Sequence, residues 1–177
     1  MTSPNELSAT EARKLIGNKQ LSPLELTKSC IEQVERYNPS INAVVAINNE
    51  DVLKEAKKAE DEVMAGKELG LLRGLPVGIK DLNPVKDLRS TSGSKLFENR
   101  IPDYDDSVVA DIRAEGGIVF CKTNTPEFGA GANTKNKVYG ATCNPFDLTK
   151  TPAGSSGGSA AALATNMMPL ANGSDYG

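Results

Sequence analysis

Apolar and polar positions recur with helical spacing over the first third of the chain. Residues 8–11, Ser-Ala-Thr-Glu, have the form of a capping box, in which serine and glutamate bond the backbone at a helix start. They predict a short helix that ends at Gly17. A stronger start follows, with Ser22 as N-cap, Pro23 at the first helical position and Glu25 at the third.

The second predicted helix has one apolar face and a defined end. We expect it to stop at Asn38-Pro39, because proline disfavours helical backbone in the residue before it. Residues 42–47, Asn-Ala-Val-Val-Ala-Ile, then predict a short strand. The apolar face of the helix consists of Leu24, Cys30, Ile31 and Val34.

A third helix is predicted over about residues 50–65, and Gly66 closes it. Its charges lie at the spacing of ion pairs one helical turn apart, so the simplest interpretation is a solvated face. The charged residues are Lys54, Glu55, Lys57, Lys58, Glu60, Asp61 and Glu62.

From about residue 72 onward, predicted strands alternate with predicted helices. This alternation indicates an α/β fold with parallel strand pairing. The connection over about residues 131–154 is long for a segment without structure, which is typical of function or substrate contact. The expected elements are a strand over 75–80, a helix capped by Asp106 or Ser107 and broken at 116–117, a strand over 118–121 and a short helix from 125–127.

Composition limits the class of protein. The 177 residues suffice for one domain with a substantial core, and a net charge of −3 is too small to indicate attraction to nucleic acid or membrane. No apolar run approaches the roughly 20 residues that span a bilayer, and residues 1–6 do not resemble a secretory signal. Cys30, Cys121 and Cys143 are odd in number and the chain has no histidine, so we expect free buried thiols in a reducing cytoplasm rather than a zinc site.

Acidic and aromatic residues around position 104 offer weaker candidates. Asp103, Asp105 and Asp106 lack the glycine and distal glutamate of a calcium loop, so a helix N-cap explains them better than a metal site. Tyr104 and Phe97 are interpreted either as pocket-lining residues or, as is commoner for single aromatics, as core.

A glycine-serine cluster at 154–159, Gly-Ser-Ser-Gly-Gly-Ser, runs directly into an alanine-rich helical segment at 160–164. Such a corner suits an anion site or a nucleophile. A flexible linker is disfavoured because the cluster abuts a helix, and a phosphate loop because its lysine is absent. A nucleophile elbow needs a strand before the serine, whereas residues 147–153 have little strand character, and it needs a histidine.

Without histidine, any serine chemistry in this chain needs another base, and Lys80 is the best-placed candidate. It ends an apolar strand, and period-two alternation turns Ile79 and Asp81 away from it. Burial favours the neutral amine, which can accept a proton from a hydroxyl. The alternative is a lysine at a strand end whose ammonium reaches solvent.

Five short segments carry a further signal. They are 74–81 (Gly-Leu-Pro-Val-Gly-Ile-Lys-Asp), 91–94 (Thr-Ser-Gly-Ser), 122–128 (Lys-Thr-Asn-Thr-Pro-Glu-Phe), 154–162 (Gly-Ser-Ser-Gly-Gly-Ser-Ala-Ala-Ala) and 173–177 (Gly-Ser-Asp-Tyr-Gly). In this order they resemble the amidase signature hydrolases. The resemblance extends from about residue 24 to residue 177 and is densest after Gly74.

The resemblance implies a Ser-Ser-Lys triad. Lys80 matches its base, and Ser155 matches the bridging serine, which follows a cis peptide bond and relays a proton. The backbone N–H groups of Tyr176 and Gly177 match part of an oxyanion hole. The remaining matches are Ser156 and Asp175, which support the loops by hydrogen bonding.

The family's attacking serine would lie two positions after Gly177, so the resemblance implies that residues 1–177 alone are inactive. The implied fold is an α/β amidase signature fold with a mixed central sheet flanked by helices, incomplete in this chain. Residues 1–177 would be the N-terminal part of one domain, with a helical segment over about 1–70 and the start of the catalytic core over about 71–177.

The implied reaction is hydrolysis of a small-molecule carboxylic amide through an acyl-enzyme, with no metal or organic cofactor. Neither nucleic acid nor membrane is an expected direct partner, and a homodimer is one expected assembly of the full-length form. One alternative is the glutaminase subunit of an amidotransferase that acts on mischarged tRNA. Another is a non-catalytic truncated remnant that keeps the fold.

Overall fold

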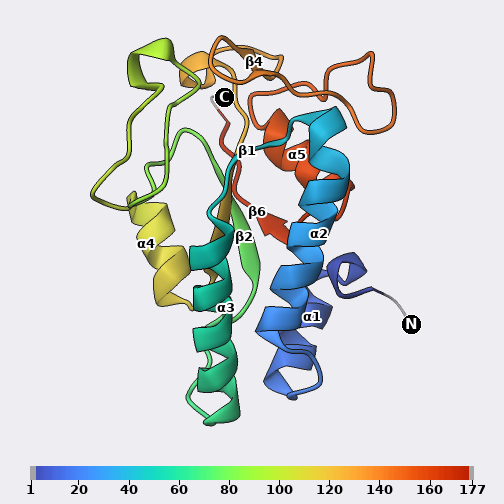
Figure 1. Ribbon diagram of the computed structural model, residues 1–177, viewed down its shortest axis with the longest axis vertical. Coiled ribbons are helices and arrows are strands. Elements are labelled where there is room, and N and C mark those ends of the chain that lie inside the picture. The colour runs from blue at the N-terminus through green and yellow to red at the C-terminus, as the bar shows by residue number, and fades with distance from the viewer. Residues whose placement is uncertain (1–2, 176–177) are drawn as a thin grey trace.

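A mixed four-stranded sheet organises the computed structural model, which describes residues 3–175 (Figure 1). The strand order is β1-β3-β2-β6, with β2 parallel to both β3 and β6 and β1 antiparallel to β3 at the edge. The expected mixed sheet flanked by helices is confirmed. The strands of this sheet are β1 (Val44–Ala46), β2 (Pro76–Lys80), β3 (Ile118–Thr123) and β6 (Leu170–Ala171).

The helices begin close to where the capping signals predict. Ser8 and Ser22 both form capping boxes, and the third helix starts after Asn48. In Figure 1, α4 lies on one side of the sheet, and α2 and α5 lie on the other. The α-helices are α1 (Ala9–Gly17), α2 (Pro23–Ile41), α3 (Asn49–Met64), α4 (Ser107–Ala114) and α5 (Gly157–Ala164). Short 3-10 turns are η1 (Pro4–Glu6), η2 (Lys95–Phe97) and η3 (Glu127–Gly129).

The expected end of the second helix at Asn38-Pro39 is wrong, because α2 contains Pro39 in its last turn. The helix ends instead at Ile41, and its C-cap is Asn42, whose φ of 56° is left-handed. The side chain of Asn38 accepts hydrogen bonds from the N–H groups of Ala43 and Val44 and donates to the Val44 carbonyl. These bonds bind the last turn to the first residues of the following strand, so the proline does not stop the helix.

The long connection over residues 131–154 is not without structure. It contains a small two-stranded ribbon of β4 (Lys135–Asn136) and β5 (Gly140–Ala141). Figure 1 shows this ribbon at the same end of the molecule as the loops that follow β2 and β3. The side chain of Asn42 donates to the carbonyls of Tyr139 and Ala141, which attaches the ribbon to the end of α2.

The two faces of the sheet are covered by separate apolar clusters. A register shift between Val77 and Gly78 leaves one extra residue, Phe120, on β3. Ile79 joins the cluster beneath α4, whereas Phe120 joins the larger cluster beneath α1, α2, α3 and α5. Lys80, next to Ile79, therefore points away from α4, as the alternation predicts.

No helix among residues 3–175 is both long enough and apolar enough to cross a bilayer. The three cysteines are free, with Cys30 and Cys121 buried. Cys143 is only half-buried, so the expectation of buried thiols fails for this residue.

The cap of α2 supports a first test. Ser22 Oγ accepts hydrogen bonds from the N–H groups of Leu24 and Glu25 at 3.0 and 3.3 Å, and it also bonds Glu60 on α3. We expect Ser22→Ala to lower the free energy of unfolding by about 1–2 kcal/mol, because helix donors lose their acceptor. Urea denaturation measures the change. Ser40→Ala, at an exposed position of the same helix, is the control, and equal losses in both variants would contradict the assignment.

Candidate active site

A buried lysine surrounded by serine hydroxyls forms the centre of the candidate site. Lys80 ends β2 and is 0 % exposed. Its Nζ donates hydrogen bonds to Ser155 Oγ at 2.7 Å, Ser156 Oγ at 2.9 Å and Ser174 Oγ at 2.8 Å. The alternative that Lys80 reaches solvent is therefore wrong.

The glycine-serine cluster forms a rigid corner rather than a linker. The Gly154–Ser155 peptide bond is cis, as the resemblance implies. The Ser155 carbonyl accepts a hydrogen bond from Thr125 Oγ1 at 3.2 Å, and the Gly157 N–H donates to Thr134 Oγ1 at 3.0 Å. No strand precedes the cluster between residues 147 and 153, so the corner is not a nucleophile elbow.

Ser156 joins this corner to the segment after β6. Its Oγ accepts from the Ser174 N–H at 3.1 Å and lies 3.2 Å from the Ser174 carbonyl, to which it donates. The expected supporting contribution of Ser156 thus has a geometric basis. The sequence pattern did not single out Ser174, although this residue lies in the matching segment 173–177.

The end of the matching segment is only partly described. Asp175 is exposed and lies with Ser155, Ser156 and Ser174 around a hollow of about 250 Å³. The other two candidate residues, Tyr176 and Gly177, lie outside the described residues.

Burial lowers the pKa of Lys80 below the ordinary value of 10.5, since desolvation penalises the ammonium. The negative charge of Asp175 acts in the opposite direction and limits this shift. Helix α5, which packs beside the lysine, contributes no charged side chain. Burial therefore makes the Lys80 ammonium easier to deprotonate, which suits a base that accepts a proton from an adjacent hydroxyl.

A second buried lysine lies on the opposite face of the sheet. Lys122 of β3 pairs in register with Ile79 and is 0 % exposed. Its Nζ lies 3.6 Å from Asp81 and donates a hydrogen bond to the Asn83 carbonyl. Desolvation lowers the pKa of Lys122 to about 8 against the opposing attraction of Asp81. The sequence did not predict the contact between Lys122 and Asp81, because the strand was expected to end before Lys122.

The acidic cluster before α4 is structural. Asp106 is the N-cap of that helix and accepts from the Val108 N–H at 3.1 Å. Asp105 accepts from Arg113 at 3.0 Å. Tyr104 is 56 % exposed, so its interpretation as core is wrong.

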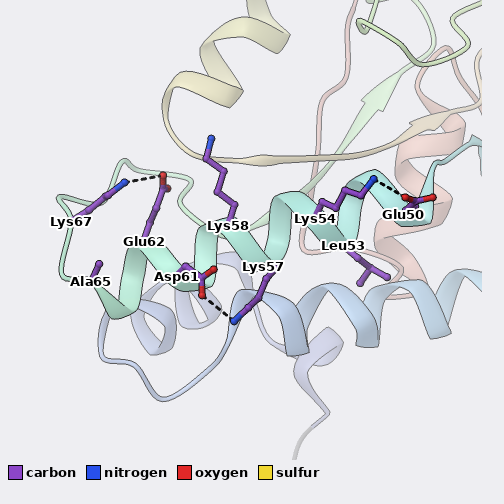
Figure 2. Close-up of a pocket in the computed structure, with 9 residues that line it drawn as sticks. All are labelled: Glu50, Leu53, Lys54, Lys57, Lys58, Asp61, Glu62, Ala65 and Lys67. Atoms are coloured by element: carbon purple, nitrogen blue, oxygen red, sulfur yellow. Dashed lines mark hydrogen bonds and ion pairs between the residues drawn. The ribbon is translucent and has the colours of Figure 1, made fainter.

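The charged face of α3 borders a hollow of about 880 Å³, and none of the serines around Lys80 lines it. Figure 2 shows its side chains paired along the helix, with Lys54 on Glu50 at 2.6 Å and Lys57 on Asp61 at 2.9 Å. These pairs are exposed and one helical turn apart, so the expected solvated face is confirmed for Lys54, Lys57, Lys58 and Asp61. Glu55, Glu60 and Glu62 are instead half-buried and bond Arg113, Ser22 and Arg73 of other segments.

The fold and the site together define an α/β protein with a buried lysine held by serine hydroxyls. A family model described as amidase matches residues 25–177, so the chain belongs to the amidase family.

Curated relatives are similar to nearly all of this chain. A glutamyl-tRNA(Gln) amidotransferase subunit of Clostridium botulinum (strain Alaska E43 / Type E3) is 41% identical over 96% of the chain and 35% of its own length. The subunit of the same name from Thermoanaerobacter pseudethanolicus (strain ATCC 33223 / 39E) is 40% identical over 97% of the chain and 35% of its own length. The chain thus spans about 35% of the length of these relatives.

Solved structures share the fold. A crystal structure of an amidase has a TM-score of 0.86 and 31% identity, and the match covers 93% of this chain and 38% of that one. A bacterial aryl acylamidase of the amidase signature family has a TM-score of 0.87 and 33% identity, covering 93% and 34%.

The corner depends on a glycine that packs against backbone. A Cβ on Gly158 would lie 2.3 Å from the Asn124 nitrogen and 2.5 Å from its oxygen. We expect Gly158→Ala to cost about 1–3 kcal/mol of unfolding free energy, because α5 must move away from the end of β3. Denaturant titration checks this against Ala164→Ser, which adds one atom at an exposed position of the same helix. A Gly158→Ala protein as stable as the control would contradict the close contact.

Proposed function

We propose that the protein containing this chain is an amidase that hydrolyses a carboxylic amide by acyl transfer through a Ser–cis-Ser–Lys triad. The observation that carries the proposal is the 2.7 Å hydrogen bond between a fully buried Lys80 amine and Ser155 Oγ. Family membership supports the choice of an amide as substrate.

The proposed first step begins with a neutral Lys80, whose Nζ donates two hydrogen bonds and accepts the third, at 2.7 Å, from the Ser155 hydroxyl. Ser155 gives its proton to Lys80 and takes one from the attacking serine, which the family resemblance puts two positions after Gly177. The alkoxide that forms attacks the amide carbon, and the C=O electron pair moves to oxygen. We propose that the backbone N–H groups of Tyr176 and Gly177 stabilise this oxyanion.

Collapse of the tetrahedral intermediate breaks the C–N bond. The leaving nitrogen takes the proton that Lys80 returns through Ser155, and ammonia or an amine departs. Water then hydrolyses the serine ester with the same groups acting as base and acid. Ser156 and Asp175 hold the two loops in place, and none of these steps calls on a cofactor.

The wider setting is also part of the proposal. Residues of about 71–177 form the start of the catalytic core, and about 1–70 form a helical segment of the same domain. The substrate is a small-molecule amide, the enzyme acts in the cytoplasm without direct contact to nucleic acid or membrane, and the full-length form assembles as a homodimer.

A second candidate function is the glutaminase subunit of a tRNA-dependent amidotransferase. The 41% identity to a glutamyl-tRNA(Gln) amidotransferase subunit favours it. Lys80 and Ser155 would then release ammonia from glutamine. Glutaminase activity that depends on added partner proteins would select this candidate, and partner-independent turnover of simple amides would select the first.

Removing the base or the relay should abolish most turnover. In the full-length protein we expect Lys80→Met and Ser155→Ala each to lower kcat/KM by about 10²–10⁴-fold, because proton transfer in the transition state is lost. Steady-state assays on a panel of amides measure this. Lys54→Met, which removes an exposed lysine of α3, is the matched control. Full activity in Lys80→Met would refute the triad.

The pH dependence follows from the lowered pKa of Lys80. Protonation of Lys80 removes the base, so kcat/KM should fall as the pH drops through this pKa. The acid limb should lie below 10.5, the ordinary value for lysine. A pH–rate profile measures the limb. A limb that stays unchanged when Asp175→Asn removes the opposing charge would contradict its assignment to Lys80, since that change should move the limb to lower pH.

A polypeptide of residues 1–177 should not hydrolyse amides, because the attacking serine that the family implies follows Gly177. Assays of this polypeptide beside the full-length protein test the expectation. Turnover by residues 1–177 that Ser155→Ala abolishes would instead make Ser155 the nucleophile.

A further inference from the structure

Asn172 occupies a central place beside Lys80. It directly follows β6, and both polar atoms of its side chain are bonded. Its Oδ1 accepts a hydrogen bond from the backbone N–H of Lys80 at 2.6 Å, and its Nδ2 donates to Asn83 Oδ1 at 2.9 Å. One side chain thus binds both the residue that carries the amine and the turn that follows it.

The backbone N–H and carbonyl of Asn172 also both make hydrogen bonds. Its N–H donates to the Gly78 carbonyl at 2.9 Å, and its carbonyl accepts from Ser159 Oγ at 2.9 Å. Ser159 in turn shares a 2.7 Å hydrogen bond with Thr123 Oγ1. Asn172 therefore links β2 to α5 and, through Ser159, to β3.

The second residue after Asn172 reaches the amine. Ser174 Oγ accepts from Lys80 Nζ at 2.8 Å, so Asn172 and Ser174 hold the same lysine at its backbone and its side-chain end. Between them, Gly173 approaches Ser156 so closely that a Cβ would lie 3.2 Å from its Oγ.

The Asn83 end of this link is anchored from the far face of the sheet. The buried Lys122 donates to the Asn83 carbonyl and pairs with Asp81. Asp81 is held in addition by Thr91, whose hydroxyl donates to it at 2.6 Å. These bonds attach the turn at 81–83 to β3 without any contribution from Asn172.

We propose that Asn172 is a positioning residue, which fixes the Lys80 amine among the serine hydroxyls by clamping the carboxyl end of β2 to the segment that carries Ser174. This inference deepens the proposed function and rests on it for the catalytic consequence. The position of the amine can be tested independently of catalysis.

Three variants separate hydrogen bonding from mere packing. Asn172→Leu keeps the approximate size of the side chain and loses both bonds. Asn172→Asp keeps the acceptor for the Lys80 N–H, and its second oxygen accepts from Asn83 after that amide rotates. Asn38→Leu is the matched control, because Asn38 is also half-buried and its side chain makes three hydrogen bonds where α2 leads into β1.

The first measurement is the titration of Lys80 in the full-length protein, followed by NMR of 13C- and 15N-labelled lysine and assigned with Lys80→Arg. The charged groups to consider are Asp175, which faces Lys80, and the Asp81–Lys122 pair on the other face, since α5 contributes no charge. We expect Asn172→Leu to move the pKa of Lys80 up toward 10.5, because the displaced amine gains water. Asn38→Leu should leave it unchanged.

The second measurement is amide hydrolysis at a pH above the acid limb. We expect Asn172→Leu to lower kcat by about 10- to 100-fold with KM nearly unchanged, because the base is misplaced while the substrate surface is intact. Asn172→Asp should stay within about threefold of the parent kcat, although its charge moves the acid limb to higher pH.

An unchanged Lys80 titration in a folded Asn172→Leu protein would overturn the inference, and so would an equal shift in Asn38→Leu. If Asn172→Leu does not fold, Asn83→Leu breaks the same link from its other end and should move the titration in the same direction. If the parent protein hydrolyses no amide, the proposed function fails, while the lysine titration still decides whether Asn172 positions the amine.

Discussion

The site depends on three hydrogen bonds between the buried Lys80 amine and serine hydroxyls. An ammonium buried without partners is costly, and the three hydroxyl oxygens around Nζ offset part of that cost. This condition explains why so many separate segments converge here. Ser155 and Ser156 come from the corner before α5, Ser174 comes from the segment after β6, and the lysine itself comes from the end of β2.

The register shift between β2 and β3 decides which face of the sheet carries the second buried lysine. The extra residue, Phe120, returns Lys122 to the face that carries Ile79, so the two buried lysines lie on opposite sides of the sheet. Each then has its own partners, with hydroxyls around Lys80 and the carboxylate of Asp81 near Lys122. Two ammonium groups on one face would repel each other and would both lose protons more easily.

Local signals in the sequence were sufficient for most helices and for the direction of the Lys80 side chain. Ser8 and Ser22 are unambiguous caps, and the period-two alternation around Ile79 is simple. The glycine-serine cluster predicted a corner before a helix, but the cis bond at Ser155 was available only through the family resemblance, since no local pattern specifies it. The link from Asn172 to Lys80 spans 92 positions, and β6 is only two residues long. A pattern of apolar and polar residues along the chain therefore predicts neither the link nor the strand. The predicted end of the second helix at Asn38-Pro39 was wrong because the hydrogen bonds of the Asn38 side chain outweigh the tendency of proline to end a helix.

The larger apolar cluster joins helices α1, α2 and α3 to residues of the sheet and of α5. Ile16, Leu26 and Ala56 are completely enclosed, and so is Phe120 on the strand they cover. The first seventy residues are thus one wall of the interior and not an appendage. Deleting helices α1, α2 and α3 would expose the apolar face of the sheet to water, so an engineered fusion or reporter should leave these helices intact.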